Sequence, residues 1–252
     1  MKRYIFSLLL IITLVSSCKS VADGSFSQFG EAPLFGMIYD SESSPVVGAM
    51  VVLDDAKSSQ TDINGRVLFS AVSQGEHSVV INKEGFEEAR MVLNFSNRDQ
   101  VLYSTLISLE SILDNLENSL QISKLTEAKS FLDRASEINS DDIRFRYLNV
   151  VYLAGIKEYT SAIDEIDLLK KSYPNDPYIT MTQAKILFYG LGKKAEALEV
   201  MQNFPLSKRN DEFESLMDKM DSGINSEEIT GESNDQDIIN RFCKENKSLT
   251  EK

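Results

Sequence analysis

The residues that could do chemistry in this chain are few. His77 is its only histidine, and Cys18 and Cys243 are its only cysteines. A Ser-His-Asp or Cys-His arrangement would have to use His77 as its base. Zinc sites draw on several His and Cys ligands, which one histidine and one free thiol do not supply. We therefore predict that the chain is not an enzyme and has neither a metal nor a cofactor, and that His77 is a structural or surface residue.

Paired carboxylates and a glycine-rich segment are the remaining candidates for a site. Asp164, Glu165 and Asp167 lie at helical spacing, which is typical of a solvated helix face. The segment 190–194 (Gly-Leu-Gly-Lys-Lys) lacks the spacing of a phosphate-binding loop and follows a predicted helix instead of a strand. We interpret it as a turn between helices.

The N-terminal residues predict export. Residues 1–17 contain two basic residues, then the apolar run Tyr4–Val15, then two serines, and these are the parts of a secretory signal peptide. The apolar run is shorter than the roughly 20 residues that a membrane-spanning helix needs. Loss of Lys2 and Arg3 with the signal peptide would change the formal net charge from −13 to −15. Because a surface with this much negative charge repels nucleic acid, we expect no nucleic-acid partner.

The residues at the end of this segment, Val15-Ser16-Ser17-Cys18, resemble the bacterial lipobox, in which the cysteine is lipidated and becomes the new N-terminus. The resemblance implies lipidation of Cys18, a flexible tether over residues 18–33 and a place in the bacterial cell envelope, held to the membrane through the lipid. Lys19 after the cysteine favours the outer membrane. The alternative is an ordinary signal peptide that ends near an incidental cysteine. With Cys18 lipidated, Cys243 has no partner for a disulfide.

Residues 34–108 read as about seven short strands separated by turns. Leu34–Asp40 and Val46–Leu53 are rich in apolar and β-branched residues, and Asp62-Ile63-Asn64-Gly65 is a strong turn signal because Asn and Gly accept positive φ. Short strands at this spacing favour an antiparallel β-sandwich.

The order of these elements is similar to that of the carboxypeptidase regulatory-like domain. The similarity rests on residues 36–40, 45–53, 61–69 and 72–79, closed by Gly85-Phe86. It covers about 75 residues and implies a transthyretin-like β-sandwich that presents or spaces other parts, without catalysis.

Residues 109–220 change to helical spacing with an internal repeat. Glu127-Ala128, Ser161-Ala162 and Glu196-Ala197 recur at intervals of 34 and 35 residues. This period is the signature of tetratricopeptide repeats, each a helix–turn–helix, and we divide the region into 109–142, 143–176 and 177–211. Ala128, Ala162 and Ala197 are predicted at close helix crossings. The alternative is a non-repeating helical bundle.

The predicted fold is therefore α+β and multi-domain: a seven-stranded antiparallel β-sandwich followed by an α-solenoid of tetratricopeptide-like hairpins. Residues 211–220 are expected to cap the last repeat, and residues 221–252 form an acidic, largely disordered tail.

The favoured function is a binding scaffold for another envelope protein or a small ligand. Stacked repeats of this family form a groove lined by the first helix of each hairpin. The residues expected to line it are Arg144, Tyr147, Val151, Met181, Lys185, Phe188 and Tyr189. The alternative for the apolar members, above all Val151 and Phe188, is that they are core. The rival function is an accessory subunit of an envelope enzyme or transport complex, or a weak hydrolase.

Overall fold

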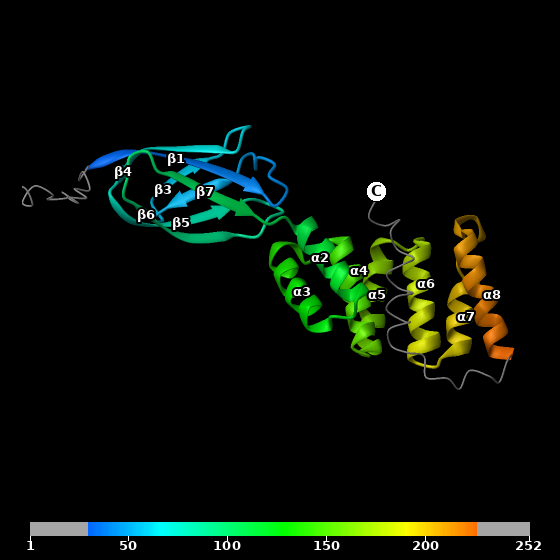
Figure 1. Cartoon of the computed structure of the whole chain (residues 1–252). Helices are drawn as coiled ribbons and strands as arrows, with labels where there is room; N and C mark the ends of the chain where they lie inside the picture. The colour runs from blue at the N-terminus through cyan, green and yellow to red at the C-terminus, as the bar shows by residue number, and fades with distance from the viewer. Residues whose placement is uncertain (1–29, 226–252) are drawn as a thin grey trace, which may run out of the picture.

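A computed structural model describes residues 30–225 of the chain. The predictions for the signal peptide, Cys18 and most of the tether, and those for Cys243 and most of the acidic tail, lie outside these residues. Strands come first along the chain and helices second, and the two parts occupy opposite ends of an elongated molecule (Figure 1). The predicted α+β class with this order is confirmed.

The strand-rich part, the sheet domain, contains two sheets. One has three strands in the order β4-β1-β7, and the other has four in the order β3-β2-β5-β6. The strands are β1 (Glu31–Asp40), β2 (Met50–Leu53), β3 (Lys57–Gln60), β4 (Arg66–Ser73), β5 (Gly75–Asn82), β6 (Ala89–Phe95) and β7 (Val101–Leu106).

Both sheets contribute to one hydrophobic core. Along β1 the side chains alternate between exposed and buried, as a strand with one face covered must. Leu34 and Ile38 of β1 share their cluster with Leu53 of β2, Ile81 of β5 and Phe95 of β6, and all five are fully buried. The two sheets therefore bury each other's inner faces.

The prediction that all strands pair antiparallel is wrong for the three-stranded sheet. β1 and β7 run parallel, from the pair Phe35 and Val101 to the pair Asp40 and Leu106. Period-two alternation identifies which face of a strand is buried but says nothing about the direction of its neighbour. Since β1 and β7 are the first and last strands of the domain, no hairpin fixes their relative direction.

The predicted turn at residues 62–65 is confirmed. The Asp62 carboxylate accepts hydrogen bonds from the backbone N–H groups of Asn64 and Arg66, both at 2.8 Å. Gly65 has a φ of +72°, and a Cβ built there would lie 2.4 Å from the carbonyl oxygen of Ile38. Glycine is needed here both for the left-handed backbone and for the close approach.

The helical part continues directly from β7. Its elements are α2 (Leu109–Gln121), α3 (Leu125–Asn139), α4 (Ile143–Gly155), α5 (Tyr159–Ser172), α6 (Pro177–Lys185), the π-helical turn η1 (Ile186–Gly190), α7 (Lys194–Gln202), the 3₁₀ turn η2 (Leu206–Lys208) and α8 (Asp211–Asn225). Helices α2 and α3, α4 and α5, and α6 and α7 pack as three successive hairpins, and α8 packs on α7 (Figure 1).

The first helices of the three hairpins begin at Leu109, Ile143 and Pro177, at intervals of 34 residues. In each case the residue before the helix caps it. Ser108, Asp142 and Asp176 accept hydrogen bonds from backbone N–H groups of the first turn. The sequence therefore repeats a helix start with its capping residue, as well as an alanine.

Ala128, Ala162 and Ala197, on the second helices, have no exposed surface, which confirms their predicted burial. Only a small side chain fits where two helix backbones approach closely. Gly190 provides a similar fit at the end of η1, because a Cβ there would lie 2.6 Å from the ring of Tyr159.

Candidate functional site

A pocket of about 470 Å³ lies where the sheet domain meets the first two hairpins. The β5–β6 connection, the first turns of α2 and the start of α4 supply its lining: Gly85, Phe86, Ser108, Leu109, Glu110, Leu113, Asp142 and Arg144. Phe86, Leu109 and Leu113 make part of the wall apolar, while Glu110, Asp142 and Arg144 bring charge. The lining therefore offers both apolar and charged groups to a partner.

Backbone hydrogen bonds across the junction hold the two parts of this pocket together. The Leu109 N–H donates to the Gly85 carbonyl at 2.8 Å, and the Glu87 N–H donates to the Ile107 carbonyl at 2.9 Å. Phe86 and Ser108 form an isolated antiparallel bridge between these two bonds. The end of β7 and the first residues of α2 are thereby fixed against the loop before β6.

An ion pair strengthens the same junction. Arg134 of α3 donates from Nε and Nη2 to the two carboxylate oxygens of Glu87, at 2.8 and 2.7 Å. The hydrogen bond from Arg134 lowers the pKa of Glu87, and the same bond raises the pKa of Arg134. This two-pronged geometry fixes orientation as well as distance. Sequence reasoning missed the pair because its members lie 47 residues apart in different parts of the fold.

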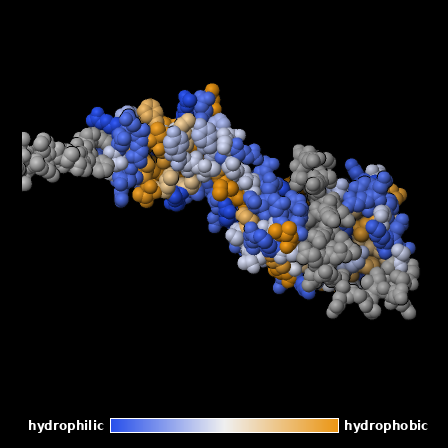
Figure 2. Space-filling model, viewed as in Figure 1, coloured by the Kyte–Doolittle hydropathy of each residue, from blue (hydrophilic) through white to orange (hydrophobic). Residues whose placement is uncertain are grey.

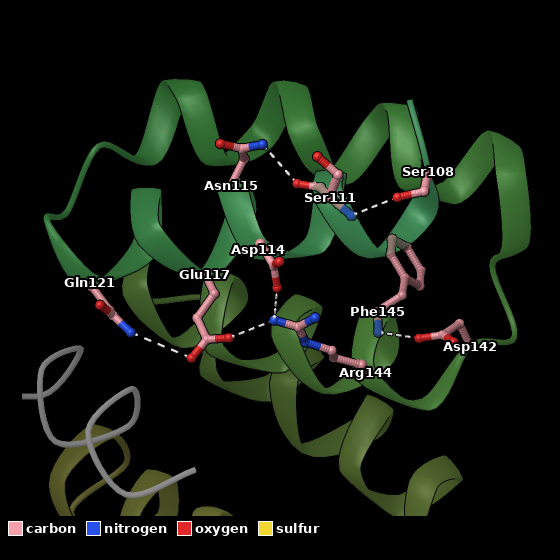
Figure 3. A network of polar contacts seen from close by, with 9 residues as sticks. All are labelled: Ser108, Ser111, Asp114, Asn115, Glu117, Gln121, Asp142, Arg144 and Phe145. Atoms are coloured by element: carbon pink, nitrogen blue, oxygen red, sulfur yellow. Dashed lines mark hydrogen bonds and ion pairs between the residues drawn. The ribbon is translucent and has the colours of Figure 1, made fainter. Parts of the chain in front are cut away.

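Arg144 is the predicted groove residue that the structure places at the pocket. Its Nη2 donates to Asp114 at 2.6 Å and to Glu117 at 2.9 Å, and both carboxylates stand on α2 (Figure 3). Burial alone would lower the pKa of Arg144, but its hydrogen bonds to Glu117 and Asp114 raise it. The guanidinium is thus a fixed charge that joins the first helices of two successive hairpins.

One hydrogen-bond donor of the Arg144 guanidinium has no partner within the described part of the chain. The Nε of Arg144 is buried and makes no hydrogen bond there. A buried unsatisfied donor costs free energy. The network therefore fixes α2 against α4 at the cost of one unsatisfied buried donor.

The spacing of Asp114 and Glu117 could have revealed these partners. Two carboxylates three residues apart share one helix face, and they precede Arg144 by 30 and 27 residues, somewhat less than one repeat. A cation at this distance after an acidic pair is a signal for contact between neighbouring first helices.

Most of the other predicted groove residues are buried. Tyr147 and Val151 belong to the core cluster of the first two hairpins, and Met181 and Phe188 belong to that of the third. Lys185 is also buried, and Tyr189 is half-buried against Phe188. In α6, residues 179–185 are all buried. For Val151 and Phe188 the alternative interpretation as core residues applies.

Tyr147 has a defined structural role. Its hydroxyl forms a hydrogen bond of 2.9 Å with the hydroxyl of Thr182, which joins α4 to α6. Together with Arg144, it links the first helices of consecutive hairpins through polar contacts.

The sole histidine lies far from the pocket, in the sheet domain. His77 is buried, with Nδ1 at 2.6 Å from Asp54 Oδ2 and Nε2 at 2.8 Å from the Ser73 carbonyl oxygen. Both nitrogens face acceptors, so the imidazolium form donates to both. Burial alone would lower the pKa of His77, but the Asp54 hydrogen bond and charge and the Ser73 carbonyl raise it. Asp54 and the next residue, Asp55, have left-handed backbone conformations, with φ of +52° and +55°. The hydrogen bond between His77 and Asp54 therefore stabilises a left-handed turn.

Among residues 30–225, no group of three or more His, Cys, Asp and Glu side chains is arranged to hold a metal ion. Over the same range, the helices are all too short or too polar to cross a bilayer.

The chain matches no protein-family model and no curated protein. Among solved structures, the Bacillus anthracis TIE protein is similar with 14% identity and a TM-score of 0.29; the match spans 31% of this chain and only 17% of that one. Two interface mutants of a type II cohesin–X-dockerin complex from Acetivibrio cellulolyticus align at 20 and 21% identity with TM-scores of 0.28 and 0.27. These two matches span 34 and 33% of this chain and 72 and 70% of the other.

Proposed function

We propose that the chain is an acylated protein of the bacterial envelope that binds a partner protein without catalysing a reaction. The sheet domain, a β-sandwich of the carboxypeptidase regulatory-like kind, spaces the helices from a lipid on Cys18. The helices form tetratricopeptide-like repeats, and the partner contacts the surface where α2 and α4 meet the sheet domain.

The observation that carries the binding role is the regularity of the hairpins together with their fixed junction to the sheet domain. Three first helices start at 34-residue intervals, each behind a capping side chain. Hairpins of this kind need neighbours to bury their apolar faces, and stacking them creates an extended surface. The pocket beside Arg144 is a hollow on that surface, lined by residues of α2, the start of α4 and the β5–β6 connection.

The chemistry available at the pocket supports binding over catalysis. Its charged groups are a guanidinium held by two carboxylates and the carboxylates of Glu110 and Asp142. Asp142 already caps α4 through the Phe145 N–H at 2.9 Å. The one histidine is engaged at both nitrogens elsewhere. These groups suit recognition of polar atoms on a partner, with Phe86 and Leu109 supplying apolar contact.

Two experiments test the proposal. For the anchor, the native and Cys18→Ser chains are expressed in a bacterial host and labelled with an alkyne fatty acid. We expect label and membrane association in the native chain only, and an unlabelled native chain would contradict the anchor. For the partner, photo-crosslinking is performed with a reactive amino acid at Glu110.

The crosslinking has a matched control at Glu137, an exposed carboxylate on α3 away from the pocket. We expect one defined adduct from position 110 that Asp114→Lys abolishes, and no adduct from position 137. Equal adducts from both positions, or hydrolysis of peptidoglycan or peptides by the purified chain, would overturn the binding role.

A further inference from the structure

The outer face of the three-stranded sheet carries a second surface that the proposed function does not use. Its outward side chains fall into register across β4, β1 and β7. Leu68, Phe35 and Val101 form one row. Arg66, Met37 and Tyr103 form the next row. We call Phe35, Met37, Leu68, Val101 and Tyr103 the apolar patch.

The members of the apolar patch are large and open to solvent. Tyr103 is 62% exposed, Phe35 52% and Leu68 50%, while Met37 and Val101 are half-buried beside them. Apolar residues are visible on the strand-rich part of the surface in Figure 2. Single exposed apolar residues are ordinary, but adjoining ones on a flat face mark a contact surface.

The charges around the apolar patch differ from those of the whole chain. The chain has a formal net charge of −13, which opposes approach to phospholipid headgroups. On the outward positions of this sheet the charged residues are Arg66, beside Met37, and Glu31, at the start of β1. The outward strand positions are therefore near neutral, and Arg66, whose charge also acts on the Asp62 carboxylate in the preceding turn, is the cation beside the apolar patch.

The position of the apolar patch in the chain points to its occupant. Gly30 is twelve residues beyond Cys18, and twelve residues span at most about 40 Å. β1 begins at the next residue and is the middle strand of the sheet that carries the apolar patch. A lipid on Cys18 thus keeps the apolar patch close to the bilayer at high effective concentration. Aromatic side chains such as Phe35 and Tyr103 suit the boundary between headgroups and acyl chains.

We infer that the apolar patch is a membrane-contacting face, which lays the three-stranded sheet on the bilayer and orients the helices relative to it. The inference rests on the anchor in the proposed function, because the tether brings the face to the lipid. The contact adds to the lipid anchor, since membrane attachment is stable when two signals act together. The helices, at the far end of the molecule, stay available to a partner (Figure 1).

The test uses the absence of tryptophan from the sequence. The mature full-length chain with Cys243→Ser is coupled through Cys18 to a maleimide phospholipid in phosphatidylcholine vesicles. Tyr103→Trp places a reporter on the apolar patch. Val92→Trp, at a residue 70% exposed on β6 of the other sheet, is the matched control.

Brominated phosphatidylcholine should quench the emission of the Tyr103→Trp chain at least twofold and leave the Val92→Trp chain nearly unchanged. Adding Leu68→Glu to the Tyr103→Trp chain should abolish the quenching while the thermal unfolding curve stays close to that of the parent. Equal quenching of both reporters, or of neither, would overturn the inference. So would a dimer of the uncoupled chain that Leu68→Glu dissociates, because a second copy would then be the occupant.

Because the chain is coupled to lipid through maleimide, the quenching result does not depend on whether the native chain is acylated at Cys18. If the native chain is not acylated but the coupled chain is quenched at position 103 alone, the anchor fails and the membrane-contacting face stands. If the native chain is acylated and no quenching occurs, the face fails and the anchor stands.

Discussion

The sheet domain and the helical part reach stability in different ways. In the sheet domain, neighbours in space are often distant in sequence, and the parallel pair of β1 and β7 closes the domain between its two ends. In the helical part, each helix packs chiefly on the helices next to it in sequence. The sheet domain should therefore unfold as one unit, whereas hairpins interact with their neighbours only and can open from the end.

The largest expected effect tests this difference with one cavity in each part. Phe95→Ala in β6 and Met201→Ala in α7 both remove fully buried side chains. We expect Phe95→Ala to cost about 3–5 kcal/mol and Met201→Ala about 2–5 kcal/mol in free energy of unfolding. Hydrogen exchange should show faster opening over all strands in the first variant, but only over α6 to α8 in the second. Global opening in both would break the comparison.

The next prediction compares two glycines that both have positive φ. Gly65, in the sheet domain, and Gly192, between η1 and α7, have φ of +72° and +66°. A Cβ at Gly65 meets a backbone oxygen, while one at Gly192 meets nothing within 4 Å. We expect Gly65→Ala to cost about 2–4 kcal/mol and Gly192→Ala about 1 kcal/mol, measured by urea unfolding. Equal costs would mean that the turn at residue 65 relaxes.

A pH dependence that arises from His77 should belong to the sheet domain. His77 has a raised pKa because of Asp54, so its stabilising effect is complete below the unfolded pKa of about 6.5 and is lost as pH rises through the folded pKa. Lys57 acts against this shift. Urea unfolding of the native chain from pH 5 to pH 9 should show the free energy of unfolding of the sheet domain decreasing.

Asp54→Asn is the matched variant for this measurement, because asparagine tolerates the left-handed backbone at this position. The variant should reduce the decrease between pH 5 and pH 9. An unchanged slope would show that Asp54 does not set the pKa of His77.

The smallest effect concerns the turns inside the hairpins. Ser123, Lys157 and Gly192 each directly precede the N-cap residue of a second helix, and all three have positive φ, at 55°, 67° and 66°. Only the third is glycine. Ser123 also has a buried hydroxyl oxygen without a hydrogen bond in the described chain. We expect Ser123→Gly to stabilise the protein by about 0.5–1 kcal/mol in thermal or urea unfolding. A destabilised variant would contradict an equivalent turn in the three hairpins.

The candidate site was predictable in part. Arg144 followed from the repeat register, because the start of α4 is set by local signals: Asp142 as cap and apolar residues at helical spacing. Tyr147, Val151, Met181 and Phe188 are buried in core clusters, and a one-sequence register does not show how deeply a helix is buried by its neighbours. Glu87, Arg134 and Phe86 were missed altogether, because their meeting depends on how the sheet domain docks on α2 and α3.

The sequence by itself determined the order of strands and helices, the turn at Gly65, the small residues at helix crossings and the interval between hairpins. Each of these follows from interactions within about one supersecondary unit, where spacing and residue type carry the physics. Tertiary structure alone decided the parallel pairing of β1 with β7, the burial all round α6, the charge bridge from Arg144 to α2 and the exposure of the apolar patch. These depend on contacts between residues far apart in the chain, whose free energy no local pattern records.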